Sequence, residues 1–458
     1  MARRQTQTGG REATTGTIVG AYSLSVGNPN RPIPEGWKWT RLMDVARLES
    51  GHTPSRRHPE YWNGEIPWIG IRDATSNYGR TIYDTVQHTN QLGIDNSSAR
   101  ILPEGTVCLS RTASVGYVVV MGRPMATSQD FVNWVCGDGI SHHFLKYVLI
   151  AERESLNMFS MGTTHQTIYY PEVKALHVAL PPRFEQDTIV GLLGALDDKI
   201  DLNRRMNETL EAMARAIFKD WFVDFGPTRA KAEGRAPYLA PELWNLFPGA
   251  LDDEGKPVGW DWGTLAMLAE VNPESWSKRD APEEVVYVDL ANTKWGSIEL
   301  MQHFPWRDAP SRAKRILRPG DTIVGLVRPG NGSFAFISIA GLTGSTGFAV
   351  LRPREPRYTQ LVYLSATAPE NIERLAHLAD GAAYPAVRPE AVEATEVAIA
   401  CDAVTIRFSA LVSSIIGRIE SNKNENQTLA QTRDLLLPRL MSGKIRLREA
   451  EQAMEAVA

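Results

Sequence analysis

The chain of 458 residues has few cysteines and no long apolar run. Its three cysteines, Cys108, Cys136 and Cys401, form no Cys-x-x-Cys pair, which argues against structural zinc and for a reducing compartment. No stretch approaches the ~18 apolar residues of a membrane-spanning helix. Residues 1–31 lack the apolar core of a secretory signal. The sequence therefore predicts a cytoplasmic protein that does not bind membranes.

Sequence motifs of common enzymes are also absent. There is no G-x-x-x-x-G-K-[ST] phosphate loop, no G-x-G-x-x-G after a predicted strand, no H-E-x-x-H and no G-x-S-x-G elbow. The Asn- or Asp-Pro-Pro-aromatic tetrapeptide of adenine methyltransferases is missing, and the nine histidines show no metal-ligand spacing. We therefore predict no catalytic residue, no metal site and no cofactor in this chain. A binding protein is favoured over an enzyme with an unrecognised site.

An excess of positive charge is lacking as well. The 49 lysines and arginines are outnumbered by 53 aspartates and glutamates, which gives a net charge of −4. Non-specific binding to nucleic acid depends on neutralising phosphates, so we expect the isolated chain to bind DNA weakly. Local basic patches remain compatible with this balance.

What the sequence does contain is an internal repeat. Ordered matches recur about 220 residues apart: Pro34–Trp39 with Pro257–Trp262, Ile101–Gly105 with Ile316–Gly320, and Val173–Pro182 with Val392–Cys401. So many matches in one order indicate two copies of one unit. Each copy begins with short apolar runs broken by Gly, Pro, Asn and Asp, which predict a β-rich domain with a few helices.

A long helix is predicted after the β-rich part of each copy. Apolar residues in 189–221 recur at steps that alternate between four and three, and so do those in 408–440. This heptad spacing is typical of a coiled coil. Asparagines take matching steps in the two seams: Asn203, Asn207, Asn422 and Asn426. We interpret them as a polar layer that fixes the register of the helix pair; asparagines facing solvent are the alternative.

If a pseudo-twofold axis relates the copies, the two helices must run antiparallel. Pairing the asparagines then sets every layer of the seam: Asn203 with Asn426, Asn207 with Asn422, Ile200 with Leu429, Leu193 with Leu436, Ile189 with Leu440, Trp221 with Phe408, and the less well matched Leu196 with Arg433 and Ala214 with Ile415. The seam of residues 189–221 would rise about 48 Å at 1.5 Å per residue and would hold the two β-rich domains apart.

Polar and basic loops in both copies are candidates for DNA contacts, because such side chains read base edges and phosphates from loops on a rigid scaffold. The candidates in the first copy are Thr53, Ser55, Arg56, Arg57, Arg72, Arg111, Ser128, Gln129, His165 and Gln166. Those in the second copy are Arg307, Arg312, Lys314, Arg315 and Arg328, in a stretch where Arg318 adds a further positive charge and only Asp308 and Asp321 oppose them. Solvation or a role in a turn is the alternative for each residue. We expect Trp62 to pack against the sheet.

Together these features resemble the specificity subunit of type I restriction–modification systems. The likeness rests on Ile33–Trp37 leading to Gly51–Ser55 and Tyr61–Trp68, on Leu180–Gln186, and on Leu437–Ile445. It spans residues 33–448 and includes the duplication. The resemblance implies an α+β fold with two tandem target-recognition domains, each reading half of a bipartite site in double-stranded DNA, and two long helices packed as an antiparallel coiled coil that serves as spacer and docking rod.

The resemblance also implies partners. These would be two methyltransferase (modification) subunits and two ATP-driven restriction subunits, with S-adenosylmethionine, ATP and Mg expected only in them. The second copy has Asn272–Trp276 where the first has the loop Thr53–Trp62, so the halves should read different sequences. A non-catalytic coiled-coil scaffold that binds only proteins is the alternative. DNA binding by the methyltransferase complex, measured with and without this chain, separates the two.

The predicted organisation follows the repeat. Its parts are a mobile N-terminal tail (1–31), target-recognition domain 1 (32–182), a central long helix (183–225), a linker with a short helix near residues 243–246 (226–256), target-recognition domain 2 (257–401), a C-terminal long helix (402–448) and a tail (449–458).

Overall fold

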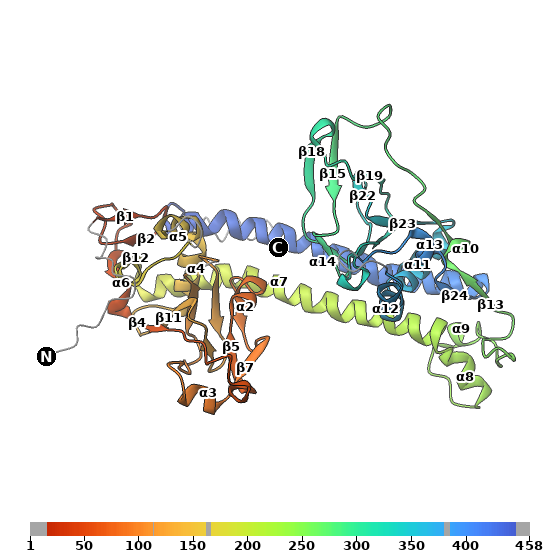
Figure 1. The fold of residues 1–458 in the computed structure, drawn as a ribbon, viewed down its shortest axis with the longest axis horizontal. Coiled ribbons are helices and arrows are strands. Elements are labelled where there is room, and N and C mark those ends of the chain that lie inside the picture. The colour runs from red at the N-terminus through yellow and green to blue at the C-terminus, as the bar shows by residue number, and fades with distance from the viewer. Residues whose placement is uncertain (1–15, 113, 162–165, 380–384, 446–458) are drawn as a thin grey trace. The chain divides into compact units, whose positions relative to one another are not determined.

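The computed structural model describes residues 16–445, except 113, 162–165 and 380–384. The chain divides into two compact units. Unit 1 contains residues 1–201 together with 425–458, and unit 2 contains residues 202–424. Two long helices, α7 (Arg183–Phe218) and α14 (Asp402–Met441), each contribute to both units (Figure 1). Both units combine sheets with helices, which confirms the predicted α+β class.

The domain of unit 1 is built on sheets with the strand orders β1-β2-β12-β3, β10-β5-β7 and β4-β11-β8-β9-β6. Its strands are β1 (Ile18–Val19), β2 (Leu24–Val26), β3 (Lys38–Arg41), β4 (Ala46–Ser50), β5 (Trp62–Ile69), β6 (Thr81–Ile82), β7 (Gln87–Thr89), β8 (Val107–Ser110), β9 (Val118–Met121), β10 (Ala126–Thr127), β11 (Phe131–Cys136) and β12 (Leu176–Leu180). Its helices besides α7 and α14 are α1 (Leu42–Val45), α2 (Ile71–Ser76), α3 (Gln91–Asp95), α4 (His142–Ala151), α5 (Arg153–Phe159) and α6 (Tyr170–Lys174), with a 3-10 turn η1 (Pro59–Tyr61).

The domain of unit 2 has sheets with the orders β13-β24, β14-β23-β20-β21, β18-β15-β22-β19 and β16-β17. Its strands are β13 (Asp261–Thr264), β14 (Ala269–Val271), β15 (Glu284–Val288), β16 (Thr293–Lys294), β17 (Ser297–Ile298), β18 (Gln302–Pro305), β19 (Ala313–Ile316), β20 (Thr322–Gly325), β21 (Phe334–Phe336), β22 (Leu342–Ser345), β23 (Phe348–Pro353) and β24 (Glu396–Ile399). Its shorter helices are α8 (Gly226–Ala232), α9 (Pro241–Trp244), α10 (Leu265–Leu268), α11 (Thr359–Ala366), α12 (Pro369–Leu378) and α13 (Pro389–Glu393), with the 3-10 turns η3 (Trp306–Asp308), η4 (Pro329–Asn331) and η5 (Pro356–Tyr358).

The repeat seen in the sequence is also a repeat of topology. The antiparallel run β4-β11-β8-β9 of unit 1 matches β14-β23-β20-β21 of unit 2, and the pair β3–β12 matches β13–β24. The central strands β5 and β15 each pair in parallel with one neighbour (β10 or β22) and antiparallel with the other (β7 or β18). Buried β-branched runs such as Val118–Val120 supply the strand cores, because they pack well on a pleated surface.

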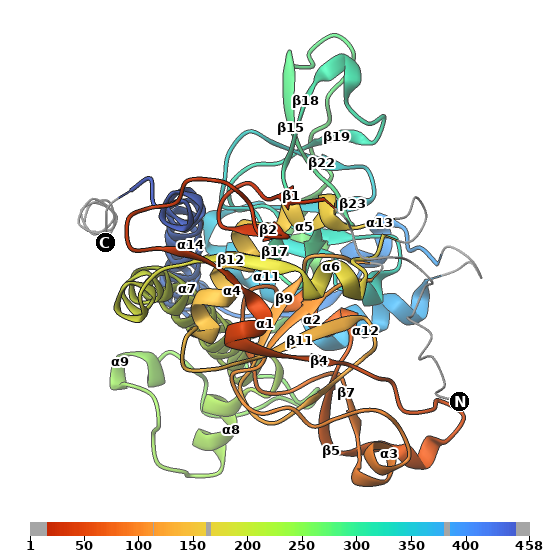
Figure 2. The same ribbon diagram turned by 90° about the vertical axis from the view of Figure 1, so that its left-hand side faces the viewer.

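The long helices run antiparallel within each unit, and Figures 1 and 2 show them side by side. In unit 1, Arg433 Nη1 on α14 donates to Asp197 Oδ1 on α7 at 2.9 Å. In unit 2, the rings of Trp221 and Phe408 lie 5.9 Å apart. These contacts join early residues of one helix to late residues of the other, as the predicted register requires. The buried seam residues of unit 1 share its core: Ile189, Leu193, Leu196, Ile200, Leu429, Leu436 and Leu440.

Of the two predicted asparagine pairs, one lies within unit 2 and the other takes one residue from each unit. Asn422 Nδ2 donates to Asn207 Oδ1 at 2.8 Å, and Asn207 Nδ2 donates to the carbonyl of Ile419 at 3.3 Å, all within unit 2. Asn203 belongs to unit 2 and Asn426 to unit 1, so their pairing stays a prediction. Asn422 is 1% exposed, which matches the interpretation of a buried polar layer in preference to a solvated one.

Both long helices end earlier than the sequence suggests. The C-terminal helix, predicted over 402–448, ends at Met441 because Gly443 adopts φ +64°, a left-handed conformation that only glycine takes without strain. The Gly443 N–H then bonds to the Leu440 carbonyl and the Lys444 N–H to the Arg439 carbonyl, which is a Schellman cap. The central helix, predicted over 183–225, ends at Phe218 and continues only as a π-helical turn, η2 (Lys219–Val223).

Much of the predicted N-terminal tail is folded, so that prediction is wrong beyond residue 15. Strand β2 pairs antiparallel with β12, and β1 pairs with β2. The buried carboxylate of Glu152 accepts backbone N–H bonds from Tyr22, Ser23 and Leu24 at 2.6–3.0 Å. These bonds anchor the segment to unit 1. Residues 1–15 and the predicted tail 449–458 lie outside the described residues.

The predicted linker 226–256 is also packed against the domain that follows it. It contains α8 and α9, the latter two residues earlier than the short helix expected near 243–246. Phe247 is buried, with its ring 4.9 Å from that of Trp221. Apolar side chains of this Pro- and Gly-rich stretch therefore form part of the unit 2 core. In the described part of the chain, no helix has the length and apolar character needed to cross a membrane.

Candidate nucleic-acid interface

The polar loop of residues 51–58 is held against a turn of unit 1. A Cβ at Gly51 would overlap the Ser128 carbonyl and the Thr127 side chain, so only glycine permits this close approach. The His52 N–H donates to the Thr127 carbonyl at 2.9 Å. The loop after β4 and the turn after β10 are thereby fixed side by side.

This contact brings together several side chains predicted to bind DNA. Thr53 Oγ1 bonds to Gln129 Oε1, and Arg111 Nη2 donates to the Gln129 carbonyl at 3.3 Å. The Arg111 guanidinium also lies 4.8 Å from the centre of the Tyr170 ring. The Ile168 N–H donates to the Arg111 carbonyl, and Gln166, two residues before Ile168, is exposed. His165 lies outside the described residues.

Arg56 is the basic residue of the loop that contacts aromatic rings. Its guanidinium lies 3.8 Å from the centre of the Trp62 ring and 5.0 Å from that of Trp68. Arg56 Nη2 also donates to Gln87 Oε1 at 2.7 Å. The Trp62 ring therefore contacts the Arg56 guanidinium on its face and also packs edge-on against Trp68.

The other candidates of unit 1 are more dispersed. Arg57 is exposed, and its N–H donates to Ser55 Oγ at 3.4 Å. Arg72 is exposed on α2, which begins beyond the opposite end of β5 from Trp62. Ser128 is buried and its hydroxyl bonds to Asp130 at 3.0 Å. Its hydroxyl is bonded within the turn, and a contact of Ser128 with DNA stays a prediction.

In unit 2 four of the five basic candidates lie in the connection after β18 or in β19 itself. Lys314 Nζ lies 4.9 Å from the centre of the Trp306 ring. Arg315 Nη1 donates to Ser275 Oγ at 3.1 Å, and burial lowers the pKa of Arg315. Arg312 and Arg307 are exposed, the latter with Nε 3.4 Å from Asp308. Arg328 lies in a different loop, after β20, where its N–H donates to the Pro385 carbonyl at 2.7 Å.

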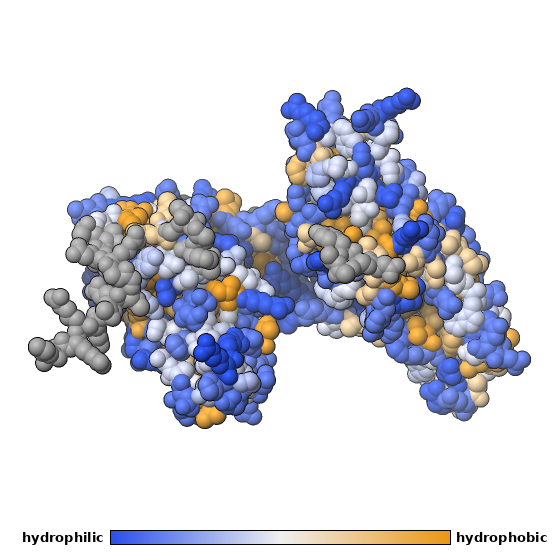
Figure 3. Space-filling view, in the orientation of Figure 1, coloured by the Kyte–Doolittle hydropathy of each residue, from blue (hydrophilic) through white to orange (hydrophobic). Residues whose placement is uncertain are grey.

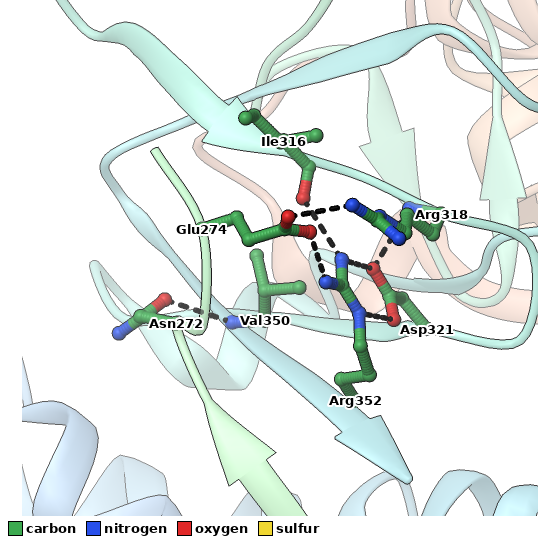
Figure 4. A network of polar contacts seen from close by, with 7 residues as sticks. All are labelled: Asn272, Glu274, Ile316, Arg318, Asp321, Val350 and Arg352. Atoms are coloured by element: carbon green, nitrogen blue, oxygen red, sulfur yellow. Dashed lines mark hydrogen bonds and ion pairs between the residues drawn. The ribbon is translucent and has the colours of Figure 1, made fainter. Parts of the chain in front are cut away.

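A charged network beside these residues was not anticipated (Figure 4). Arg352 Nε and Nη2 donate to Asp321 at 2.9 and 2.8 Å, and Arg352 Nη1 donates to Glu274. Arg318 Nη2 donates to Glu274 Oε1 at 2.6 Å. The hydrogen bond from Arg352 lowers the pKa of Glu274, and the bonds to Asp321 raise that of Arg352.

This network corrects the charge count of the basic stretch. Arg318 is neutralised by Glu274, which the count omitted because it lies 44 residues upstream. Asp321 is buried and faces Arg352 instead of the candidate cations. Glu274 belongs to the segment Asn272–Trp276 that replaces the basic loop of the first copy. Asn272 anchors that segment by bonding to the backbone of Val350 in both directions, at 2.7 and 3.1 Å.

A pair of matched polar residues also escaped the sequence reading. Gln87 lies opposite Trp68 in the β5–β7 pair, and Gln302 lies opposite Tyr287 in the β15–β18 pair. A histidine follows each glutamine, so a Gln-His dipeptide recurs at the same strand position in both units. The recurrence was visible in the sequence, but its significance depends on the strand pairing. Figure 3 shows mostly hydrophilic surface over the β15–β18 hairpin and over the α3 end of unit 1.

Comparisons with known proteins agree on one family. A model of the type I restriction modification DNA specificity domain matches residues 34–212. The chain is 25% identical over 440 residues to the type I restriction enzyme MjaIX specificity subunit of Methanocaldococcus jannaschii, covering 91% of this chain and 95% of that one. It is 24% identical over 356 residues to the HindI specificity subunit of Haemophilus influenzae, covering 65% and 76%. The fold resembles the crystal structure of a type I restriction-modification S subunit from M. genitalium, with a TM-score of 0.52, 15% identity, and coverage of 90% and 97%.

Proposed function

Because the chain belongs to the family of type I restriction–modification specificity subunits, we propose that it selects the DNA target of such a system. The observation that carries the proposal is the alignment of specificity subunits along nearly the whole duplicated chain. The two units share a strand order but present different polar loops. Each unit then reads one half of a bipartite site, and the two halves differ in sequence.

The half-sites are assigned to the loop residues of each unit. In unit 1 the group formed by Thr53, Gln129 and Arg111, together with Arg56 and Arg57, contacts the first half-site. In unit 2 residues of the connection after β18 and of β19 itself contact the second half-site: Arg307, Arg312, Lys314 and Arg315. A side chain that donates to a base edge supplies about 1–3 kcal/mol of discrimination, whereas a phosphate contact supports all sequences alike.

The catalytic activities belong to partner subunits. The chain assembles with modification and restriction subunits, two of each, and these hold S-adenosylmethionine, ATP and Mg. The helix pair α7–α14 serves as the docking rod, and its length sets the gap between the half-sites. The absence of enzyme motifs from the sequence supports this division of labour.

Mapping of methylated sites tests the assignment of one unit to each half-site. The chain is reconstituted with the modification subunits of the same type I system, and the methylated motif is read by methylation-sensitive sequencing. Alanine at Arg56 and Arg57 should alter the first half only, and alanine at Arg312, Lys314 and Arg315 the second half only. A change in both halves from either set contradicts the assignment. Loss of chain-dependent DNA binding by the complex would be the outcome for a protein-binding scaffold.

The spacer is tested separately. Insertion of one helical turn after Asn207 and after Asn426 should lengthen the gap between half-sites and leave both half-site sequences unchanged. An unchanged gap would show that the helix pair does not set the spacing.

A further inference from the structure

Both units place a cation on the face of a tryptophan. In unit 1, Arg56 lies over Trp62 at 3.8 Å. In unit 2, Lys314 lies over Trp306 at 4.9 Å. Such contacts hold the cation in one direction and contribute about 0.5–1 kcal/mol at partly exposed sites. The two pairs do not match in the sequence repeat, because their residues come from different connections.

The strand pairing nevertheless puts the two stacks at the same place in the repeated fold. Trp62 is the first residue of β5. Trp306 follows the last residue of β18, and its N–H donates to the carbonyl of Glu283, the residue before β15 begins. Since β5 and β15 are equivalent central strands, both tryptophans lie at the end where the central strand starts. One copy supplies the ring from the central strand and the other from its neighbour.

This end of the strand pair is remote from the long helices of each unit. In Figure 1, β15 and β18 project from unit 2 away from α7 and α14, and α3, which contacts the start of β5, lies at the outer edge of unit 1. Arg56 and Gln87 are exposed there, and Lys314 and Trp306 are half-buried. The stacked cations are therefore accessible to a large ligand in the described part of each unit.

We propose that the two stacks are equivalent points of base readout, one in each half-site, where the cation donates to the major-groove edge of a guanine. The inference rests on the proposed function and names the contact. Arg and Lys both pair with guanine O6 and N7. A side chain already fixed by a ring, and for Arg56 also by the 2.7 Å bond to Gln87, loses little freedom on binding and keeps its direction. A phosphate contact would need no such fixing, since it tolerates a mobile cation.

The repeat adds a geometric consequence. Two contacts that occupy equivalent places in two copies of one fold should meet equivalent positions of their half-sites, counted from the central gap. The rest of the loops differ between the units, so only this position is expected to share its base.

The experiment uses the chain assembled with its modification subunits. Arg56→Gln and Lys314→Gln remove the cations, while Trp62→Leu and Trp306→Leu keep the cations and remove the stacks. The matched controls are Arg123→Gln and Arg279→Gln, which change exposed arginines of the same two units that belong to neither group of proposed DNA contacts and do not stack on a ring among the described residues. The methylated motif is sequenced for each variant, and binding of the complex to DNA is measured against salt concentration.

Arg56→Gln should reduce discrimination at one guanine of the first half-site by about tenfold or more, and Lys314→Gln at the corresponding guanine of the second. The tryptophan variants should relax the same positions to a smaller extent, and the controls should leave those positions unchanged. Because both cations are accessible, their glutamine variants should fold; thermal unfolding of the complex checks this.

Three results overturn the inference. Equal weakening on all sequences, with the salt slope reduced by about one, would identify phosphate contacts. Relaxation at positions that do not correspond would refute the equivalence of the stacks. If the methylated motif is unchanged in all four variants, the stacked residues do not contact the DNA. In each case a chain-dependent bipartite motif would leave the proposed function standing, whereas a motif that does not depend on the chain would refute both.

Discussion

The two units join their β-rich domains to the long helices with different chemistry. In unit 1 the helix α4 contacts the sheet on one side, and its Lys146 and Tyr147 reach Asp197 of α7 at 3.3 and 2.8 Å. Arg433 of α14 binds the other oxygen of the same carboxylate. Burial alone would raise the pKa of Asp197, but Lys146, Arg433 and Tyr147 together lower it.

In unit 2 the corresponding helix α11 rests on an aromatic core. Phe408 of α14 is fully buried, with ring centres 4.8 Å from Phe222 and 5.9 Å from Trp221. Tyr363 of α11 is buried as well. The two junctions share helix positions, strand order and a buried tyrosine on the shorter helix, but the ionic group of Lys146, Asp197 and Arg433 is found only in unit 1 among the described residues. Duplication has thus preserved the geometry of the joint. In unit 1 a carboxylate bonded by three side chains is added to the apolar packing, and in unit 2 aromatic rings supply much of that packing.

The largest expected effect comes from the aromatic joint. Phe408→Ala should lower the free energy of unfolding by about 3–5 kcal/mol, since it removes a buried ring and leaves a cavity. Hydrogen exchange followed by mass spectrometry should show the loss in peptides of unit 2. Leu411→Ala, three residues away but 39% exposed, is the control and should cost little. Equal losses from both variants would contradict the central place of Phe408.

The ionic joint should respond to loss of its carboxylate. Asp197→Asn leaves the ammonium of Lys146, whose side chain is 7% exposed, without its counter-ion and should cost about 3 kcal/mol. The exchange rates should rise in unit 1 peptides and not in those of unit 2. Replacing Lys146, Asp197 and Arg433 together by apolar residues should recover most of the loss. Failure to recover it would mean that the three residues do not act as one group.

The asparagine pair of unit 2 offers a smaller test. Asn422→Leu leaves the amide of Asn207 against an aliphatic side chain and should cost about 1–3 kcal/mol. The double change Asn207→Leu with Asn422→Leu should be close to neutral or stabilising in unfolding measurements, because neither amide is then left buried. A double variant as unstable as the sum of the singles would show that the two side chains are not partners.

A fall in pH should have the smallest of these effects. It removes the stabilisation that the Asp197 carboxylate gives to unit 1. The folded-state pKa of Asp197 lies below its usual value of 3.8, so its stabilising effect is present at neutral pH and is lost as the pH falls through that folded value. The stability difference between the wild type and Asp197→Asn should therefore shrink below about pH 4. Denaturant unfolding across a pH series measures this. A difference that stays constant would place the cost of the variant in packing instead of charge.

The antiparallel pairing of the two long helices was predictable because it depends on the spacing of residues along the sequence. The seam steps and the asparagines gave the antiparallel register, and the contacts Asn207–Asn422 and Trp221–Phe408 follow it. The predicted seam placed Arg433 opposite Leu196, a poorly matched pair that offers the arginine no polar partner. Arg433 instead binds Asp197, which is one position away from the seam and so was invisible to a heptad pattern.

The features that sequence reading missed depend on residues brought together by the fold. Nothing near residues 21–24 signals that Glu152 will accept their N–H groups, and the anchored strand was read as a tail. The neutralisation of Arg318 by Glu274 depends on separate segments meeting. The stack of Arg56 on Trp62 lies within one loop and could have been suspected. That of Lys314 on Trp306 depends on the path of the chain from β18 to β19.

The division of the chain has a consequence for the order of folding during synthesis. Unit 2 is continuous, from residue 202 to 424, whereas unit 1 needs residues from both ends of the chain. Until the ribosome has released Leu436, Leu440 and Met441, the apolar face of α7 around Leu193 lacks its partners in the unit 1 core. Contacts so distant in sequence form slowly and leave apolar surface exposed meanwhile. Unit 2 is therefore expected to complete its core before unit 1, although the ribosome begins unit 1 first.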